Sequence, residues 1–158
     1  MWRCASCTRE TAIASSLCLH CGSGARSGAG AAGAAPAPAP ASLSSVPEVQ
    51  IDADGVFKYV LITVEHGGGA RHTLVRGHAW AAYHDDVFQH YRPSLAAVPG
   101  VTSVSCPGGG RIAVDAILKR ARVYGHSIGY GRAKHAVTAA ALTRALPGWA
   151  VTHDNEGY

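Results

Sequence analysis

The sequence predicts an α+β fold in which one mixed β-sheet of about six strands is flanked by two helices. Short runs rich in β-branched and aromatic residues follow one another after Val46, and each has the length of a strand. One longer segment carries apolar residues at helical spacing, and another begins after glycines and ends at a Pro-Gly pair, as a helix does. Because the strands and helices do not alternate strictly, an α+β arrangement is favoured over a parallel α/β one.

The expected elements follow in chain order. A central strand is expected over 57–64 (FKYVLITV), and after a glycine-rich break its hairpin partner over 73–77 (TLVRG). Three further strands are expected over 101–106, 110–116 and 122–127, and a last short one over 149–153. One helix is expected over 129–148, ending at Pro147-Gly148. The other is expected over 78–91, because helical spacing joins Trp80, Tyr83, His84, Val87, Phe88 and Tyr91.

Composition divides the chain into three parts. At 158 residues, 47% of them apolar, it is long enough for one domain and a small additional module. Residues 25–45 are rich in Gly, Ala, Ser and Pro and cannot bury enough apolar surface to fold, so a disordered linker is expected there. The linker separates a small module at 1–24 from a folded domain at 46–158.

The first module carries two Cys-x-x-Cys pairs, which together supply the four thiolates that a structural Zn²⁺ prefers. Their spacing, with a leading Trp2, resembles the RanBP2-type (NZF) zinc finger. Thr11 stands where that family usually has Asn, and Thr8-Arg9 stand where its ubiquitin-binding members favour Thr-Phe. Ubiquitin and RNA therefore both remain open as ligands of the finger. The expected zinc ligands are Cys4, Cys7, Cys18 and Cys21.

Charge and hydropathy restrict the partners and the location. The net charge of +4 suits anionic substrates but lacks the clustered basic residues that would by themselves indicate nucleic acid. No run approaches 18 apolar residues, so no membrane span is expected. A monomer in the cytoplasm, with the nucleus as a second compartment, is expected. The alternative is an organelle presequence at 1–45, which is rich in Ala and Ser and holds three arginines and one acid.

Two features of the folded domain indicate chemistry on an anion. His84 lies on the inward stripe of the expected first helix, where an imidazole at the edge of a core can act as an acid, a base or a nucleophile. The segment "YGHSIGYGRAKHA" (124–136) places Ser127 and several glycines ahead of a helix, and backbone N–H groups in such a turn can bind an anion. Lys58, Arg76 and Arg111 lie in or beside strands and can add positive charge. The alternative is a surface histidine, ordinary loop glycines and solvated charges.

Several segments together resemble the phosphohistidine phosphatase (janus/ocnus) family. They lie between residues 46 and 158, and none lies in residues 1–45. The segments are "VPEVQIDADGVFKYVLITV", "LVRGHAWAAYHDD", "GGGRI", "VYGHSIGYGRAKHAV" and "VTHDNEGY". The resemblance implies a small α+β domain that hydrolyses the P–N bond of phosphohistidine in proteins without a metal. It implies that His84 is the catalytic residue, that Lys58 binds phosphate, and that Ser127, Ile128 and Gly129 form the phosphate loop. His126 and Gly129 depart from the family pattern of an aromatic residue and an alanine, which leaves substrate preference open.

The implied mechanism rests on charge, because a phosphoryl group in transfer spreads negative charge over its oxygens. The loop N–H groups, Ser127 and Lys58 would hold those oxygens, with Arg76 or Arg111 as extra clamps. His84 would act as the general base that activates water, or as a nucleophile that carries the phosphoryl group. The expected partners are phosphohistidine-containing proteins. The alternatives are a non-catalytic phosphoprotein-binding adaptor and a hydrolase of phospholysine or small phosphoramidates.

Overall fold

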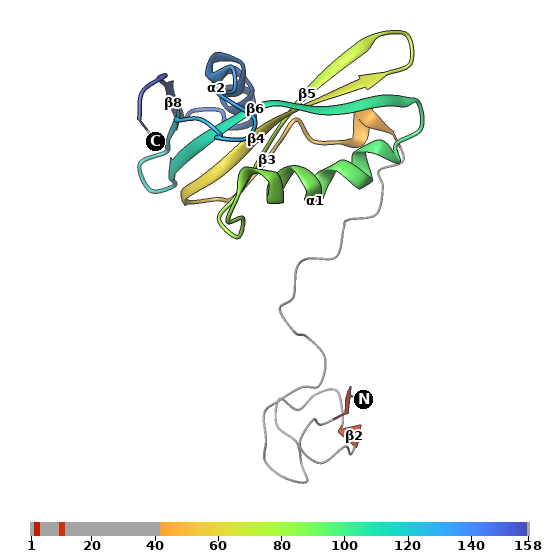
Figure 1. Cartoon of the computed structure of the whole chain (residues 1–158). Helices are drawn as coiled ribbons and strands as arrows, with labels where there is room; N and C mark the ends of the chain where they lie inside the picture. The colour runs from red at the N-terminus through yellow and green to blue at the C-terminus, as the bar shows by residue number, and fades with distance from the viewer. Residues whose placement is uncertain (1, 4–9, 12–41, 158) are drawn as a thin grey trace. The chain divides into compact units, whose positions relative to one another are not determined.

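The structure is a computed structural model that describes residues 2–3, 10–11 and 42–157 (Figure 1). These residues belong to two compact units, one within residues 1–35 and the other within residues 36–158. In the first, β1 (Trp2–Arg3) pairs antiparallel with β2 (Glu10–Thr11), and Trp2 lies opposite Thr11. The expected zinc ligands Cys4, Cys7, Cys18 and Cys21 and most of the expected linker lie outside the described residues.

The second unit is built on one mixed sheet of six strands, in the order β3-β5-β4-β6-β7-β8. The inner pairs are antiparallel, whereas β3 with β5 and β7 with β8 are parallel. This confirms the α+β fold and its two helices. In chain order the elements are η1 (Leu43–Ser45), β3 (Val49–Ile51), β4 (Gly55–His66), β5 (Ala70–His78), α1 (His84–Ala96), β6 (Val101–Asp115), β7 (Arg120–Tyr124), α2 (His135–Ala145) and β8 (Ala150–His153).

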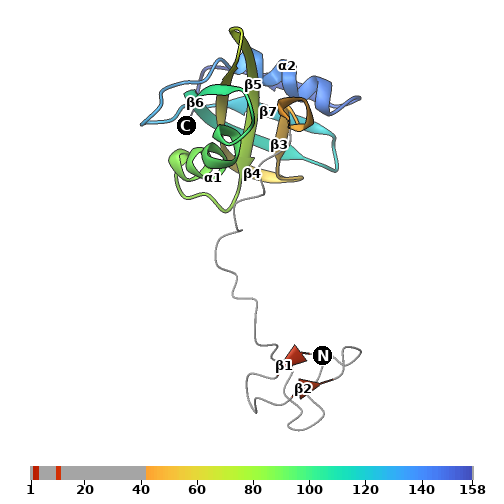
Figure 2. The ribbon, with the colours of Figure 1, turned by 90° about the vertical axis from the view of Figure 1, so that its right-hand side faces the viewer.

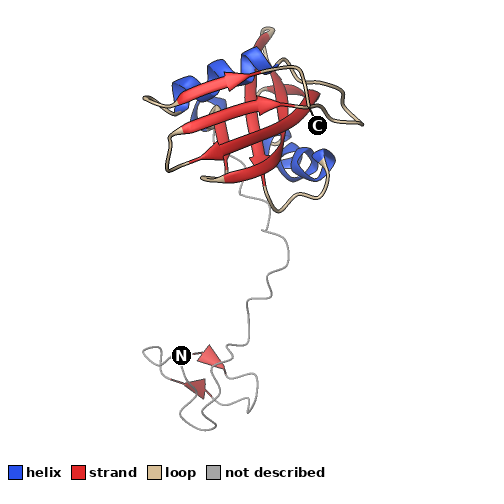
Figure 3. Ribbon diagram, turned by 90° about the vertical axis from the view of Figure 1, so that its left-hand side faces the viewer, coloured by secondary structure: helices blue, strands red, loops and turns tan. Residues whose placement is uncertain are grey.

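The two helices cover opposite faces of the sheet, as Figure 2 shows. Side chains of a strand alternate between the faces, so β4 supplies both cores. Val60, Ile62 and Val64 pack in the core that also holds Val87 and Phe88 of α1. The core on the other face holds Phe57, Tyr59 and Leu61 together with Ala141 and Leu142 of α2. Because β4 and β6 are long, part of the sheet extends past the helices, and Figure 3 shows strands with no helix in front of them.

The boundary of α1 differs from the expected helix over 78–91. The helix begins only at His84, and Tyr83 is its N-cap residue, with the Tyr83 N–H donating to Asp86 Oδ2 at 2.7 Å. Residues 79–83 form a loop, and the side chains of Trp80 and Tyr83 are exposed rather than buried. Helical spacing alone could not show this, because the acidic cap at Asp86 sets where the helix starts.

The strands also differ in detail. The two strands expected over 101–106 and 110–116 are one strand, β6, with register shifts against β4. The glycines Gly108, Gly109 and Gly110 do not interrupt it, because they serve close packing rather than a turn: a Cβ at any of the three would lie 2.6–2.7 Å from backbone atoms of neighbouring segments. The short edge strand β3 was not expected, and its pairing partner β5 identifies it only in three dimensions.

Candidate active site

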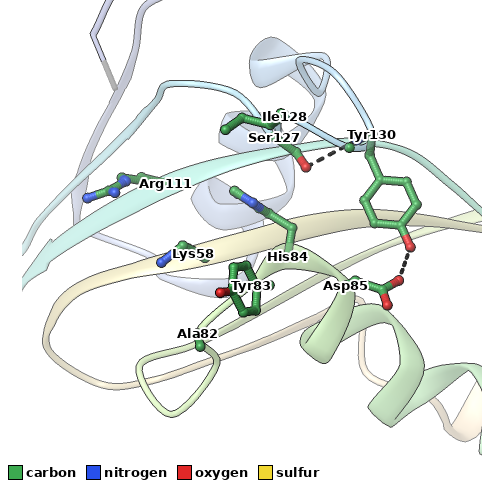
Figure 4. A pocket seen from close by; sticks show the side chains of 10 residues that line it. Lys58, Ala82, Tyr83, His84, Asp85, Arg111, Ser127, Ile128 and Tyr130 are labelled. Carbon is green, nitrogen blue, oxygen red and sulfur yellow. Dashed lines mark hydrogen bonds between the residues drawn. The ribbon is translucent and has the colours of Figure 1, made fainter.

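A pocket of about 460 Å³ opens between the start of α1, the loop after β7, and the sheet (Figure 4). Lys58 on β4 and Arg111 on β6 are direct cross-strand partners, so both side chains leave the same face of the sheet. The structure thus brings together six of the seven residues expected to act on the substrate. The lining residues are Lys58, Ala82, Tyr83, His84, Asp85, Arg111, Ser127, Ile128, Gly129 and Tyr130.

His84 is the first residue of α1, and its side chain is buried against strand β6. Its Nε2 lies 2.9 Å from the carbonyl oxygen of Gly110. Because a carbonyl can only accept a hydrogen bond, Nε2 carries the proton in the neutral ring, and the lone pair is on Nδ1. Figure 4 shows the ring extending toward the side of the pocket on which Arg111 and Lys58 lie.

The surroundings of His84 keep the ring neutral. Burial lowers the pKa of His84 most strongly, and the positive charges of Lys58 and Arg111 lower it further, while the bond to Gly110 opposes them. The ring is therefore unprotonated near pH 7 and can take up a proton or attack an electrophile. A neutral imidazole beside two cationic side chains is what a base or nucleophile acting on a phosphoryl group needs.

The glycine run on β6 makes room for this ring. A Cβ on Gly109 would lie 2.8 Å from Cδ2 of His84 and 2.7 Å from the carbonyl oxygen of Tyr59. Only a glycine permits both approaches, so the run seats the imidazole directly on the strand that also carries Arg111. The sequence shows the three glycines, but their role depends on contacts made by distant segments.

The loop after β7 holds Ser127 with its side chain turned inward. The Ser127 N–H donates to the Gly131 carbonyl at 3.1 Å and the Gly131 N–H donates back at 2.9 Å, while Ser127 Oγ accepts from the Tyr130 N–H at 3.2 Å. Gly131 has φ 79°, which favours glycine. Within the described part of the chain, the N–H groups of Ile128 and Gly129 donate to no other group. Backbone N–H groups without a protein acceptor, beside a serine hydroxyl, are the kind of donors with which loops bind anions.

Two further contacts hold this loop in place. On the pocket side, the Tyr130 hydroxyl donates to Asp85 Oδ1, which joins the loop to the first turn of α1. This bond lowers the pKa of Asp85, whereas burial and the Asp85 carboxylate raise that of Tyr130 to about 12. On the opposite face, the Tyr59 hydroxyl donates to His135 Nδ1 at 2.7 Å, and His135 Nε2 donates to the carbonyl of Gly125 at 2.8 Å. The loop is therefore anchored at its start and near its middle.

His135 was not singled out in the sequence, although it is as buried as any residue of the site. Its burial lowers its pKa, as for His84, but both of its ring nitrogens bond to the protein. It therefore anchors the loop and does not line the pocket. Its position at the start of α2, directly after the glycine-rich segment, was the only signal that sequence offered.

Arg76 is the expected site residue that the structure places elsewhere. Its guanidinium is buried, 1% exposed, and donates to the carbonyls of Pro47, Glu48 and Val75 at 2.8–3.2 Å. It also lies over the Tyr91 ring, 5.1 Å from its centre. Arg76 does not line the pocket, because β5 carries it under α1 and not into the opening. Arg76 is therefore not in a position to contact a phosphoryl group in this pocket, whereas Arg111 lines it.

Comparison with known proteins shows the family to which this chain belongs. The Janus/Ocnus family pattern matches residues 43–150, and the chain belongs to that family. It is 39% identical over 122 residues to the 14 kDa phosphohistidine phosphatase of Sus scrofa, covering 73% of this chain and 95% of that protein. The Homo sapiens protein of the same name is also 39% identical, with 73% and 96% covered. The sex-regulated protein janus-A of Drosophila melanogaster is 38% identical over 117 residues, with 74% and 85% covered.

The described residues hold no cluster of three or more His, Cys, Asp or Glu side chains that could bind a metal ion. Of the helices in the same part of the chain, none is long and apolar enough to cross a membrane. The four cysteines of the expected zinc finger lie outside that part, so the zinc prediction stays a prediction.

Proposed function

We propose that this protein hydrolyses the P–N bond of phosphohistidine in proteins, with His84 as the catalytic residue. The observation that carries the proposal is the hydrogen bond from His84 Nε2 to Gly110, which leaves a neutral Nδ1 lone pair in a pocket with two basic side chains. The two relatives named phosphohistidine phosphatase, each 39% identical over most of their length, support the same reaction.

The phosphoryl group would be held from two sides. Lys58 and Arg111 are cross-strand partners and present positive charge from the sheet. The N–H groups of Ile128 and Gly129 and the Ser127 hydroxyl would donate to the remaining oxygens from the loop. These groups stabilise charge that grows on the phosphoryl oxygens during transfer, and they are fixed before the substrate arrives.

In the reaction we favour, His84 is a general base. The oxygen of a water molecule bonds to phosphorus as the P–N bond breaks, and the water's proton passes to Nδ1 of His84. The leaving imidazole takes the electron pair of the P–N bond and receives the proton that His84 took from water, so inorganic phosphate and histidine result and His84 is neutral again. In the nucleophilic variant, Nδ1 bonds to phosphorus as the substrate's P–N bond breaks and its imidazole leaves with a proton; water then attacks phosphorus, breaks the bond to Nδ1 and releases phosphate. Side chains and backbone amides of the chain fill every role, and the proposed reaction requires no metal.

The test uses the full-length protein with a phosphohistidine peptide and a phospholysine peptide, each with and without a chelator. Phosphate release from the phosphohistidine peptide that the chelator does not reduce is the expected result. Faster release from the phospholysine peptide would shift the substrate class to the alternative hydrolase. Binding of either peptide without any phosphate release would contradict the proposal and favour the adaptor, a role compatible with the janus-A relatives, whose name states no reaction.

We also propose that Cys4, Cys7, Cys18 and Cys21 bind one structural zinc ion. Four thiolates in two pairs supply a closed tetrahedral set, and the module has no part in the proposed reaction. The zinc content of a fragment of residues 1–30 is expected to be one per chain, and replacing Cys18 and Cys21 by Ser should abolish it. A fragment without bound zinc would contradict the assignment.

A further inference from the structure

A second groove of about 450 Å³ lies on the sheet beside the pocket. Strand register gives its orientation. Val56 pairs with Ala113, Ala113 with Arg122, and Arg122 with Thr152, so these side chains leave one face. The same face carries Lys58 and Arg111, each two residues along its strand from Val56 and Ala113. The lining residues are Val56, Ala113, Val114, Asp115, Arg120, Ala121, Arg122, Ala150 and Thr152.

The groove therefore continues the active-site pocket. One repeat of the pleat, about 7 Å, separates Lys58 from Val56 along β4 and Arg111 from Ala113 along β6. Helix α1 packs on the core around Val60, Ile62 and Val64, toward the other end of β4, and leaves this end of the face uncovered. Strands are seen without a helix in front of them in Figure 3. A chain that enters the pocket can thus continue onto the sheet without crossing a helix.

The groove is apolar along its floor and basic at its border. Val56 is 56% exposed although it is a large apolar residue in a strand, and the other apolar lining residues are Ala113, Val114, Ala121 and Ala150. Arg120 and Arg122 line the groove from β7. Asp115 also lines it, and Asp154 pairs with Arg122 at 2.8 Å. With the pocket included, four basic side chains (Lys58, Arg111, Arg120 and Arg122) lie along this path against three acids (Asp85, Asp115 and Asp154).

We infer that this groove binds the segment of the phosphoprotein substrate that flanks its phosphohistidine, and that it prefers a segment of apolar and acidic residues. The inference rests on the proposed function, because a histidine held in a protein can reach His84 only if its own backbone passes over the adjoining surface. The groove is continuous with the pocket, and its basic border matches an acidic partner. It would supply binding energy remote from the phosphoryl group and so select among phosphohistidine proteins.

The test compares Val56→Asp with the wild type on three substrates. These are phosphoramidate, whose leaving group is ammonia, and two phosphohistidine peptides, one flanked by Leu and Glu residues and one flanked by Lys residues. The wild type should prefer the Leu/Glu peptide. Val56→Asp should raise the KM for that peptide about 10-fold and leave kcat/KM for phosphoramidate within about 2-fold, since a remote contact acts on binding of the flank alone.

Thr102→Asp is the matched control, because Thr102 is an exposed residue at the start of β6, at the opposite end of that strand from Arg111 and Ala113, and lines neither the pocket nor the proposed groove. It should change none of the three activities. An unchanged peptide KM in Val56→Asp, or an equal loss on phosphoramidate, would overturn the inference. If the wild type hydrolyses none of the substrates, the proposed function fails instead. In that case calorimetry can measure the affinity of the unphosphorylated Leu/Glu peptide for the wild type and for Val56→Asp. Weaker binding to Val56→Asp would support the groove as a peptide-binding site, and equal affinity would overturn the inference.

Discussion

Replacing Gly109 by alanine should displace the His84 imidazole, the proposed catalytic group, while leaving every polar group of the pocket in the chain. The added Cβ would lie 2.8 Å from Cδ2 of His84, whereas ordinary contacts of this kind begin at 3.4 Å, so the ring must move by about 0.6 Å or more. The other close neighbour, the carbonyl oxygen of Tyr59 at 2.7 Å, belongs to the backbone of β4 and yields less readily. Relief of both contacts therefore requires a shift of the paired β4 and β6 backbones as well as of the His84 ring, whose 2.9 Å bond to Gly110 is strained.

The expected cost has two parts. Overpacking at a tight site destabilises the fold by about 1–3 kcal/mol, which urea denaturation would measure. Misplacing a catalytic group by up to an ångström lowers the rate by up to about 100-fold, so kcat on phosphoramidate should fall by tens of fold in the folded variant. Loosening of the Gly110 bond should also let Nδ1 and Nε2 exchange the proton, which NMR of the histidine nitrogens would detect.

The control is Gly67→Ala in the turn after β4, where the nearest atom to an added Cβ is a carbonyl oxygen at 3.7 Å, an ordinary contact. Its stability and kcat should match the wild type closely. A folded Gly109→Ala protein with wild-type kcat would refute the argument that the glycine run positions His84.

Three further results are expected. Because the pKa of His84 is lowered, kcat/KM should rise with pH along an acid limb below about 6.5, the usual histidine value, and be flat at neutral pH. Burial lowers the pKa of both His84 and His135, so these histidines bind protons more readily in the unfolded chain. The free energy of unfolding should therefore decrease as the pH falls below about 6.5. An increase in the free energy of unfolding over that range would contradict this effect of burial. Lys58→Met should raise the KM by about 10-fold and move the acid limb to higher pH, since a charge that lowers the His84 pKa is gone; an unmoved limb would count against their proximity. Arg76→Met should destabilise the fold by about 1–3 kcal/mol in urea, because buried carbonyls of Pro47 and Glu48 lose their donor; unchanged stability would show that those bonds contribute little.

The sequence was enough to predict the fold class, because strands and helices depend on local patterns such as the β-branched run of β4 and the helical spacing of α1. The roles expected of His84, Lys58 and Ser127 came from the resemblance to a family, and the structure places all three residues around one pocket. What could not be predicted depends on pairing between distant segments. Register on the sheet puts Lys58 beside Arg111, while Arg76, on the next strand, is carried beneath Tyr91.

The role of the three glycines in β6 could not be predicted either, because it depends on contacts with distant segments. Gly108 to Gly110 suggested a turn between two strands, since glycine is common in turns. In the fold they lie mid-strand, with the His84 ring against one and the His135 ring against another. Backbone atoms of neighbouring segments, together with the rings from α1 and α2, explain why no side chain fits there. The helix start at His84 was likewise set by a cap at Asp86 and not by apolar spacing.

The most direct test of the account is the rate of phosphate release from a phosphohistidine peptide by the wild type and by His84→Ala. Both proteins should be folded, by circular dichroism, and both should bind inorganic phosphate, because Lys58, Arg111 and the loop remain. The account predicts that His84→Ala releases phosphate at least about 1,000-fold more slowly, since the only proposed base or nucleophile is gone. Release at the wild-type rate by a folded His84→Ala protein would contradict it.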